Sequence, residues 1–164
     1  MHIWKILTRT NKPPKFRGPN QKSPDAFVRS FCVDYTIWND YCYQQSKTAR
    51  EEGKSSPKLM DKFTKLYTVF LAPYLESGVN LQLITFGSHS SFSPKRLTIG
   101  EVTIENTLIK QRFNIKMTSI DGYNEFYAML KKTIDGDLKL LQIYYIDPYP
   151  EYPPDGDGEN LPYL

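Results

Sequence analysis

The spacing of apolar side chains divides the chain into a helical part and an extended part, and the change falls near Gly78. Before Gly78, apolar residues recur every three or four positions, which is the period of one face of a helix. After Gly78 they alternate with polar residues, which is the period of a strand with one buried face. The pattern predicts an α+β fold with two N-terminal helices packed on a curved antiparallel sheet.

The first predicted helix begins after Ser23, because serine caps a helix well, Pro24 suits the first helical position and Asp25 complements the helix dipole. We expect it to end near residue 48, before Gly53. A second helix is predicted to begin at Ser56-Pro57 and to end or bend at Pro73. The apolar stripe of the first helix consists of Phe27, Phe31, Tyr35, Trp38 and Cys42.

Four extended segments are predicted after Gly78, at residues 81–86, 97–118, 123–133 and 138–146. Aspartate-glycine pairs at 121–122 and 135–136 separate the last three, as expected of hairpin turns that require positive φ. In the second segment Phe113 shares the buried face with Ile109, Ile115 and Met117. The buried face changes within the last segment, so a β-bulge is predicted near Leu141.

The two ends of the chain differ sharply in charge. Residues 1–22 carry six basic side chains and no acid, whereas residues 147–164 carry five acids and no base. We expect an irregular basic arm at residues 1–22, a single domain at residues 23–147, and an acidic tail rich in Tyr and Pro at residues 148–164. Proline lacks the ladder donor, so the tail is not expected to continue the sheet.

Composition narrows the class of protein further. With 164 residues, 40% hydrophobic and 24% charged, the chain fits one globular domain. No apolar run is long enough for a membrane span or a signal peptide, so we expect a cytoplasmic protein without a membrane partner. Cys32 and Cys42 lie ten residues apart on one predicted helix, too far for a disulfide, and no zinc site or other cofactor is expected. The basic arm lacks a recognition motif, and the acidic tail would repel phosphate, so no nucleic-acid partner is expected.

The order of two helices followed by a long hairpin meander resembles the cone-shaped fold of nuclear transport factor 2-like proteins. Four features are similar to the immunity-protein branch of that superfamily: Trp38 and Cys42 on an aromatic helix, Phe86-Gly87-Ser88, Phe92-Ser93-Pro94, and Asp135-Gly136-Asp137-Leu138 before Ile143. The resemblance covers about residues 25–147. It implies a non-catalytic immunity protein of a bacterial polymorphic toxin system, which binds and neutralises a cognate toxin. A monomer and a homodimer are both compatible with the sequence.

An alternative is a small-molecule binding protein or an enzyme of the isomerase or dehydratase type, since some relatives of the cone fold use acid-base groups inside the cone. Its pocket would include Asp34, Trp38, Phe113 and Tyr127. Asp34 is the one acid on the apolar stripe of the first helix, and proton abstraction would need its pKa to lie near neutrality. The structural alternative is that Asp34 accepts a hydrogen bond from a tyrosine, such as Tyr67 or Tyr127, or from a loop amide. His89 is expected to be an exposed loop residue.

The acidic tail is the predicted contact segment for a toxin, which we expect to be basic. Prolines stiffen the tail and limit the entropy lost on docking, while acidic groups speed the encounter with a basic partner. The candidate partner-binding residues are Tyr149, Tyr152, Asp155, Asp157 and Glu159. The other expectation is that the tail folds back over its own sheet.

Overall fold

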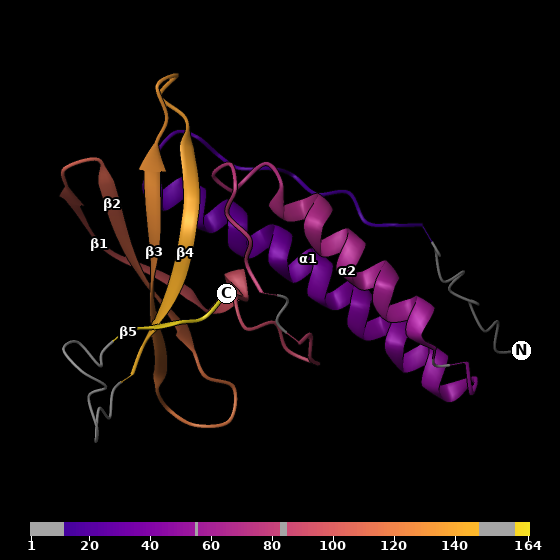
Figure 1. Ribbon diagram of the computed structural model, residues 1–164. Coiled ribbons are helices and arrows are strands. Elements are labelled where there is room, and N and C mark those ends of the chain that lie inside the picture. Colours follow the sequence, from indigo (N-terminus) through magenta and orange to yellow (C-terminus); the bar gives the residue numbers. More distant parts are fainter. Residues whose placement is uncertain (1–11, 55, 83–84, 148–159) are drawn as a thin grey trace, which may run out of the picture.

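A computed structural model describes residues 12–54, 56–82, 85–147 and 160–164 (Figure 1). Two helices come first and an antiparallel sheet follows, which confirms the predicted α+β class. The helices are α1 (Pro24–Glu51), α2 (Pro57–Leu71) and the short 3-10 helix η1 (Pro94–Arg96). The strands are β1 (Leu97–Glu105), β2 (Leu108–Lys116), β3 (Tyr123–Lys132), β4 (Leu138–Ile146) and β5 (Asn160–Pro162).

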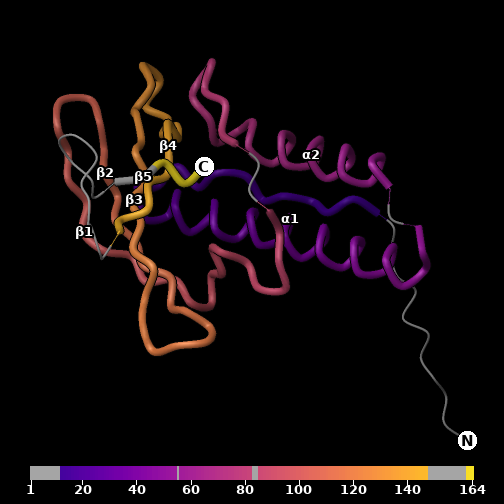
Figure 2. Tube along the Cα trace, turned by 60° about the horizontal axis from the view of Figure 1, so that its bottom comes forward, coloured from indigo at the N-terminus to yellow at the C-terminus, as the bar shows by residue number. Residues whose placement is uncertain are grey.

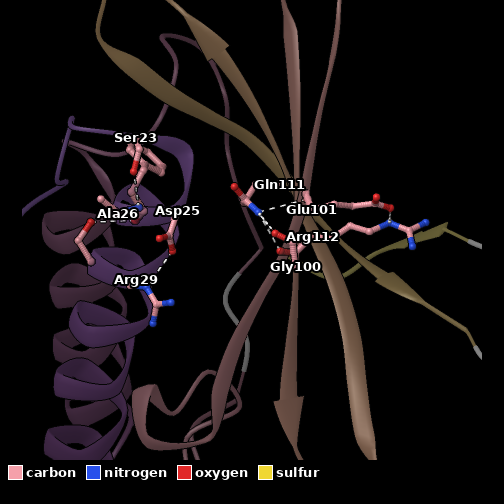
Figure 3. A network of polar contacts seen from close by, with 10 residues as sticks. Ser23, Asp25, Ala26, Arg29, Gly100, Glu101, Gln111 and Arg112 are labelled. Atoms are coloured by element: carbon pink, nitrogen blue, oxygen red, sulfur yellow. Dashed lines mark hydrogen bonds and ion pairs between the residues drawn. The ribbon is translucent and has the colours of Figure 1, made fainter.

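Both helices begin where the sequence predicts. Ser23 has an extended backbone, and its Oγ accepts a hydrogen bond from the Ala26 N–H at 3.1 Å, which satisfies one of the free amides of the first turn (Figure 3). Asp25 lies beside the positive end of the dipole and pairs with Arg29 at 2.8 Å. α1 ends at Glu51, three residues later than predicted, just before Gly53 adopts a φ of 66°.

The sheet is a meander in which strands β1 to β5 are hydrogen-bonded neighbours in sequence order. The segment predicted as continuous, residues 97–118, is in fact a hairpin of β1 and β2. Its two-residue turn is Asn106-Thr107, and Asn106 has a φ of 56°, a conformation that asparagine tolerates better than most residues. The sheet is open, twisted and curved (Figure 1).

Two irregularities in register bend the sheet. Between β3 and β4, Met129 pairs with Gln142 and Leu130 with Leu140, so Leu141 is the extra residue and the predicted bulge is confirmed. A second irregularity lies between Ile99 and Val102 of β1. Extra residues of this kind increase the local twist of a strand.

Two segments cover the outer edge of β4, one where a separate strand was predicted and one from the tail, which was not expected to continue the sheet. The described parts of residues 81–86 form no strand; instead Tyr74 and Glu76, just after α2, exchange backbone hydrogen bonds with Leu140 at 2.7 and 3.1 Å. β5 pairs with Tyr144–Ile146, so the end of the tail does extend the sheet. Pro162 is tolerated there because β5 is an edge strand, whose outer N–H groups need no partner.

The core fills the space between the helices and the sheet with aromatic rings. Figures 1 and 2 show α1 and α2 packed antiparallel, with α1 nearer to the sheet and both helices running past it. Phe92 lies at the centre, where its ring contacts Tyr35 of α1 at 4.8 Å and Phe126 of β3 at 5.3 Å between centroids. Tyr163, from the end of the tail, closes the same cluster against Phe126 at 5.0 Å.

Residues 12–22, the described part of the arm, contain no helix or strand and run along the line between α1 and α2 (Figure 2). The Phe16 ring lies 5.5 Å from Phe70. The Gln21 side chain makes two hydrogen bonds to the backbone of Leu138, at 2.6 and 3.2 Å. This part of the arm therefore packs against the domain.

Candidate functional site

Asp34 is buried where α1, the arm and the end of α2 meet, and it is completely shielded from solvent. Its Oδ1 accepts a hydrogen bond from the Arg17 N–H at 2.8 Å, and its Oδ2 accepts one from the Gly18 N–H at 2.8 Å. The Tyr74 hydroxyl donates to the same Oδ2 at 2.8 Å. Both oxygens of the carboxylate are therefore engaged.

Tyr74 is held as a neutral hydrogen-bond donor. Burial raises the pKa of its hydroxyl above the ordinary value, a hydrogen bond with Ser30 lowers it, and the neighbouring Asp34 raises it further. A neutral hydroxyl donates to a carboxylate, whereas a phenolate would repel it. Tyr74 and the two arm amides thus compensate the cost of burying the Asp34 oxygens.

Asp34 accepts hydrogen bonds from a tyrosine and two loop amides, as the structural alternative predicted. The tyrosine is Tyr74, however, and not Tyr67 or Tyr127. Tyr67 donates its hydroxyl to the backbone oxygen of Gln82 at 3.1 Å. Tyr127 lies on the outer face of the sheet, which is turned away from the helices. Tyr74 continues the helical spacing of apolar residues in the second predicted helix, but no local pattern indicates that its hydroxyl reaches Asp34, 40 residues away in the chain.

The other predicted pocket residues are not gathered around a cavity. Trp38 and Phe113 are fully buried among other rings, and the Trp38 Nε1 donates to the Phe63 oxygen at 3.0 Å. Tyr127 stacks on Tyr144 on the outer face of the sheet, with 4.8 Å between centroids, and the Lys110 Nζ lies 4.0 Å from its ring centre. Burial raises the pKa of the Tyr127 hydroxyl, and the neighbouring Tyr144 raises it further.

The two cysteines, Cys32 and Cys42, are free and buried. Burial raises the pKa of the Cys42 thiol to about 12, against a smaller lowering by Lys62. Burial also raises the pKa of the Cys32 thiol. Thiols that stay protonated at neutral pH are poor nucleophiles and poor metal ligands. Within the described ranges, no three His, Cys, Asp or Glu side chains gather in a way that would hold a metal ion.

An open groove of about 420 Å³ lies between α1, the loop of residues 87–93, η1 and Arg17. Side chains from α1 anchor the loop. The Asn39 amide exchanges two hydrogen bonds of 2.9 Å with the Gly87 backbone, and the Thr36 hydroxyl donates to Ser90 at 2.8 Å. The floor of the groove is therefore a fixed surface.

Basic groups predominate around this groove. Arg17, Lys95 and Arg96 line it together with one acid, Asp40. Arg96 has a structural role, because its guanidinium donates to the backbone oxygens of Ser90 and Lys116, both at 2.7 Å. His89 is exposed on the loop, as expected, and also lines a second groove of about 290 Å³ beside Met117 and Tyr163. Open grooves bordered by a loop and a helix are able to receive the side chains of a protein partner.

The most exposed apolar strand is β1, which the sequence reasoning did not single out. Val102 and Ile104 are 47% and 68% exposed, although their register partners Gln111 and Ile109 on β2 are buried. The polar run Glu105-Asn106-Thr107 between Ile104 and Leu108 was the signal for a turn that would have identified β1 as a separate edge strand.

The predicted contact residues of the tail, Tyr149, Tyr152, Asp155, Asp157 and Glu159, lie outside the described residues. The described end of the tail does fold onto the sheet: the Tyr163 N–H donates to the Ile143 oxygen at 2.8 Å, and Leu164 is buried.

Comparison of the chain with protein-family models, with curated proteins and with solved structures finds no match. A search of the described helices finds none with the length and apolar character that a membrane crossing requires.

Proposed function

We propose that the chain is a non-catalytic immunity protein of a bacterial polymorphic toxin system, which binds a cognate protein toxin in the cytoplasm and neutralises it. The proposal begins from the resemblance to the immunity-protein branch of the nuclear transport factor 2-like superfamily. The observed order of helices and strands is compatible with that resemblance. The role itself is argued from the surface and the interior of the molecule.

The observation that carries the proposal is the state of Asp34. A general base must keep an oxygen within reach of its substrate, but both oxygens of this carboxylate are occupied by Arg17, Gly18 and Tyr74, and the side chain is fully buried. The rings of the core fill the space that a pocket would need. A protein that acts by surface complementarity requires no such pocket.

The exposed features favour a protein partner. Val102 and Ile104 present apolar side chains at the edge of the sheet, and two open grooves border the loop at His89. Apolar groups surrounded by polar ones are characteristic of protein interfaces. Together they supply a contact surface on the described part of the chain.

The test is neutralisation of the toxin encoded beside this chain. Cells that express that toxin should survive only when the chain is co-expressed, and the two purified proteins should form a stoichiometric complex in size-exclusion chromatography. A toxin from an unrelated system, expressed in the same cells, serves as the control and should remain lethal. The proposal is wrong if the chain neither protects the cells nor binds the neighbouring toxin.

A further inference from the structure

β1 is the open edge of the sheet among the described residues. The opposite edge, on β4, is covered by the segment around Tyr74 and by β5, whereas β1 pairs only with β2. An uncovered edge strand presents unpaired N–H and C=O groups that accept a strand from another chain.

The geometry of the β1–β2 hairpin determines which N–H and C=O groups of β1 point to the free edge. Because the turn Asn106-Thr107 has two residues, Glu105 and Leu108 form the hydrogen-bonded closing pair of the ladder. Hydrogen-bonded and non-hydrogen-bonded pairs alternate in an antiparallel ladder, so the N–H and C=O groups of Val102 and Ile104 are directed to the free edge. A partner strand would pair with these two residues.

The side chains on this edge are also available. Val102 and Ile104 are 47% and 68% exposed, and they continue the apolar face of Ile109, which is buried. Neither helix covers them. A strand added beside β1 would extend that apolar face and remove these side chains from water.

β1 lacks most of the features that protect an edge strand. Lysine and proline commonly discourage pairing, but the nine residues of β1 contain no Lys, Arg or Pro. The bulge at Gly100 and Glu101 is the exception. The Gln111 Nε2 holds it by donating to the oxygens of Gly100 and Glu101 at 3.0 and 3.3 Å, so the regular edge runs from Val102 to Glu105 (Figure 3).

The charge of β1 indicates the chemistry of the partner. Its charged side chains are both acidic, Glu101 and Glu105. Glu101 makes a long ion pair of 3.9 Å with Arg112, and both glutamates are exposed. Opposite charges across paired strands are favourable and like charges are not. A second copy of β1 would place acids near acids, whereas a basic strand would complement them.

We infer that an extended segment of the toxin adds to the sheet along Val102 to Glu105. This segment alternates apolar side chains, packed beside Val102 and Ile104, with basic side chains on the outer face near Glu105. The inference rests on the proposed function and specifies how the partner is bound.

The edge is tested with a pair of matched isoleucine-to-proline variants, each mixed with the toxin encoded beside the chain. Ile104→Pro removes an edge N–H that does not bond to β2, so the domain should keep its fold while the partner strand loses a donor. Ile134→Pro is the control, since Ile134 is fully exposed at the second position of a turn, where proline is favoured. We expect Ile104→Pro to raise the Kd at least tenfold and Ile134→Pro to change it less than twofold.

Two further measurements make the result independent of how the proline variant folds. In the unmutated chain, hydrogen exchange at the amides of Val102 and Ile104 should slow at least tenfold when the toxin binds. Glu105→Lys should slow association at low salt, and Asp135→Lys, in an exposed turn, should not.

The outcomes separate the two proposals. If the toxin binds but the exchange rates at Val102 and Ile104 do not change, the edge inference is overturned and the immunity role stands. If the unmutated chain binds no toxin, both proposals fall.

Discussion

Asp34 shows how a single polar residue on an apolar stripe organises its surroundings. An unpaired buried carboxylate would cost several kcal/mol, so its position on α1 requires donors from elsewhere in the fold. The arm supplies two amides, from Arg17 and Gly18, and the segment after α2 supplies the Tyr74 hydroxyl. Three parts of the chain are therefore joined at one side chain.

At this scale we predict that Asp34→Asn destabilises the domain by about 1–3 kcal/mol, because the new amide group faces N–H donors and leaves at least one of them unpaired. The measurement is urea unfolding followed by circular dichroism. Asp61→Asn, an exposed position on α2, is the matched control and should change the free energy of unfolding by less than about 0.5 kcal/mol. Equal stability of the two variants would contradict the role given to Asp34.

At the scale of elements, the strands follow the alternation in the sequence closely. In β2, Phe113 faces the helices and is fully buried, stacked on Phe126 with 5.3 Å between centroids. Lys116, three residues on, faces outward and is exposed. Side chains of a strand alternate between its two faces, so Phe113 and Lys116 together show which residues of β2 face the core and which face water.

We therefore predict that Phe113→Asp unfolds the domain or costs more than about 4 kcal/mol, since it removes a core ring and buries an unpaired charge. Lys116→Asp should stay within about 0.5 kcal/mol of the unmutated chain. Thermal unfolding of both variants, monitored by circular dichroism, makes the comparison. Similar losses in the two variants would show that the phase of β2 is wrong.

At the scale of the whole molecule, the two ends of the chain help to complete the fold. Residues 12–22 lie between α1 and α2, and Tyr163 and Leu164 close the core beside β4. The tail end and the segment around Tyr74 also cover the β4 edge of the sheet. Among the described residues, these contacts leave β1 as the edge at which another chain has access.

Removal of residues 1–22 should therefore destabilise the domain, because Asp34 would keep only Tyr74 as a donor and Phe70 would lose the Phe16 ring. Hydrogen bonds to charged groups are worth about 1.5–3 kcal/mol each, so we expect a loss of about 3 kcal/mol or more. For a domain of this size that loss corresponds to a fall of roughly 6–12 °C in Tm. Lys15→Ala, an exposed change in the arm, is the control, and scanning calorimetry is the measurement. An unaltered Tm after the deletion would contradict the packing of the arm.

Local signals were sufficient for most elements because they act over a few residues. The cap at Ser23, the stripe of α1 and the bulge at Leu141 depend on neighbours along the chain, and the structure has each of them. Both Asp-Gly pairs lie between strands, but not as turns with two positive-φ positions: the connections run through residues 117–122 and 133–137, and Gly136 alone of the four residues has a positive φ. The hairpin at Asn106 was missed because its polar run is short and contains no glycine.

The sequence by itself determined the helices, most of the strands and the face that each buries, since periodicity records which side of an element avoids water. Only the tertiary structure decided which residues meet. It paired Asp34 with Tyr74, placed Tyr127 on the outer face, brought Pro162 onto β4 and, in the part of the chain that the structure describes, left β1 uncovered. These outcomes depend on contacts between residues far apart in the chain, which no local pattern encodes.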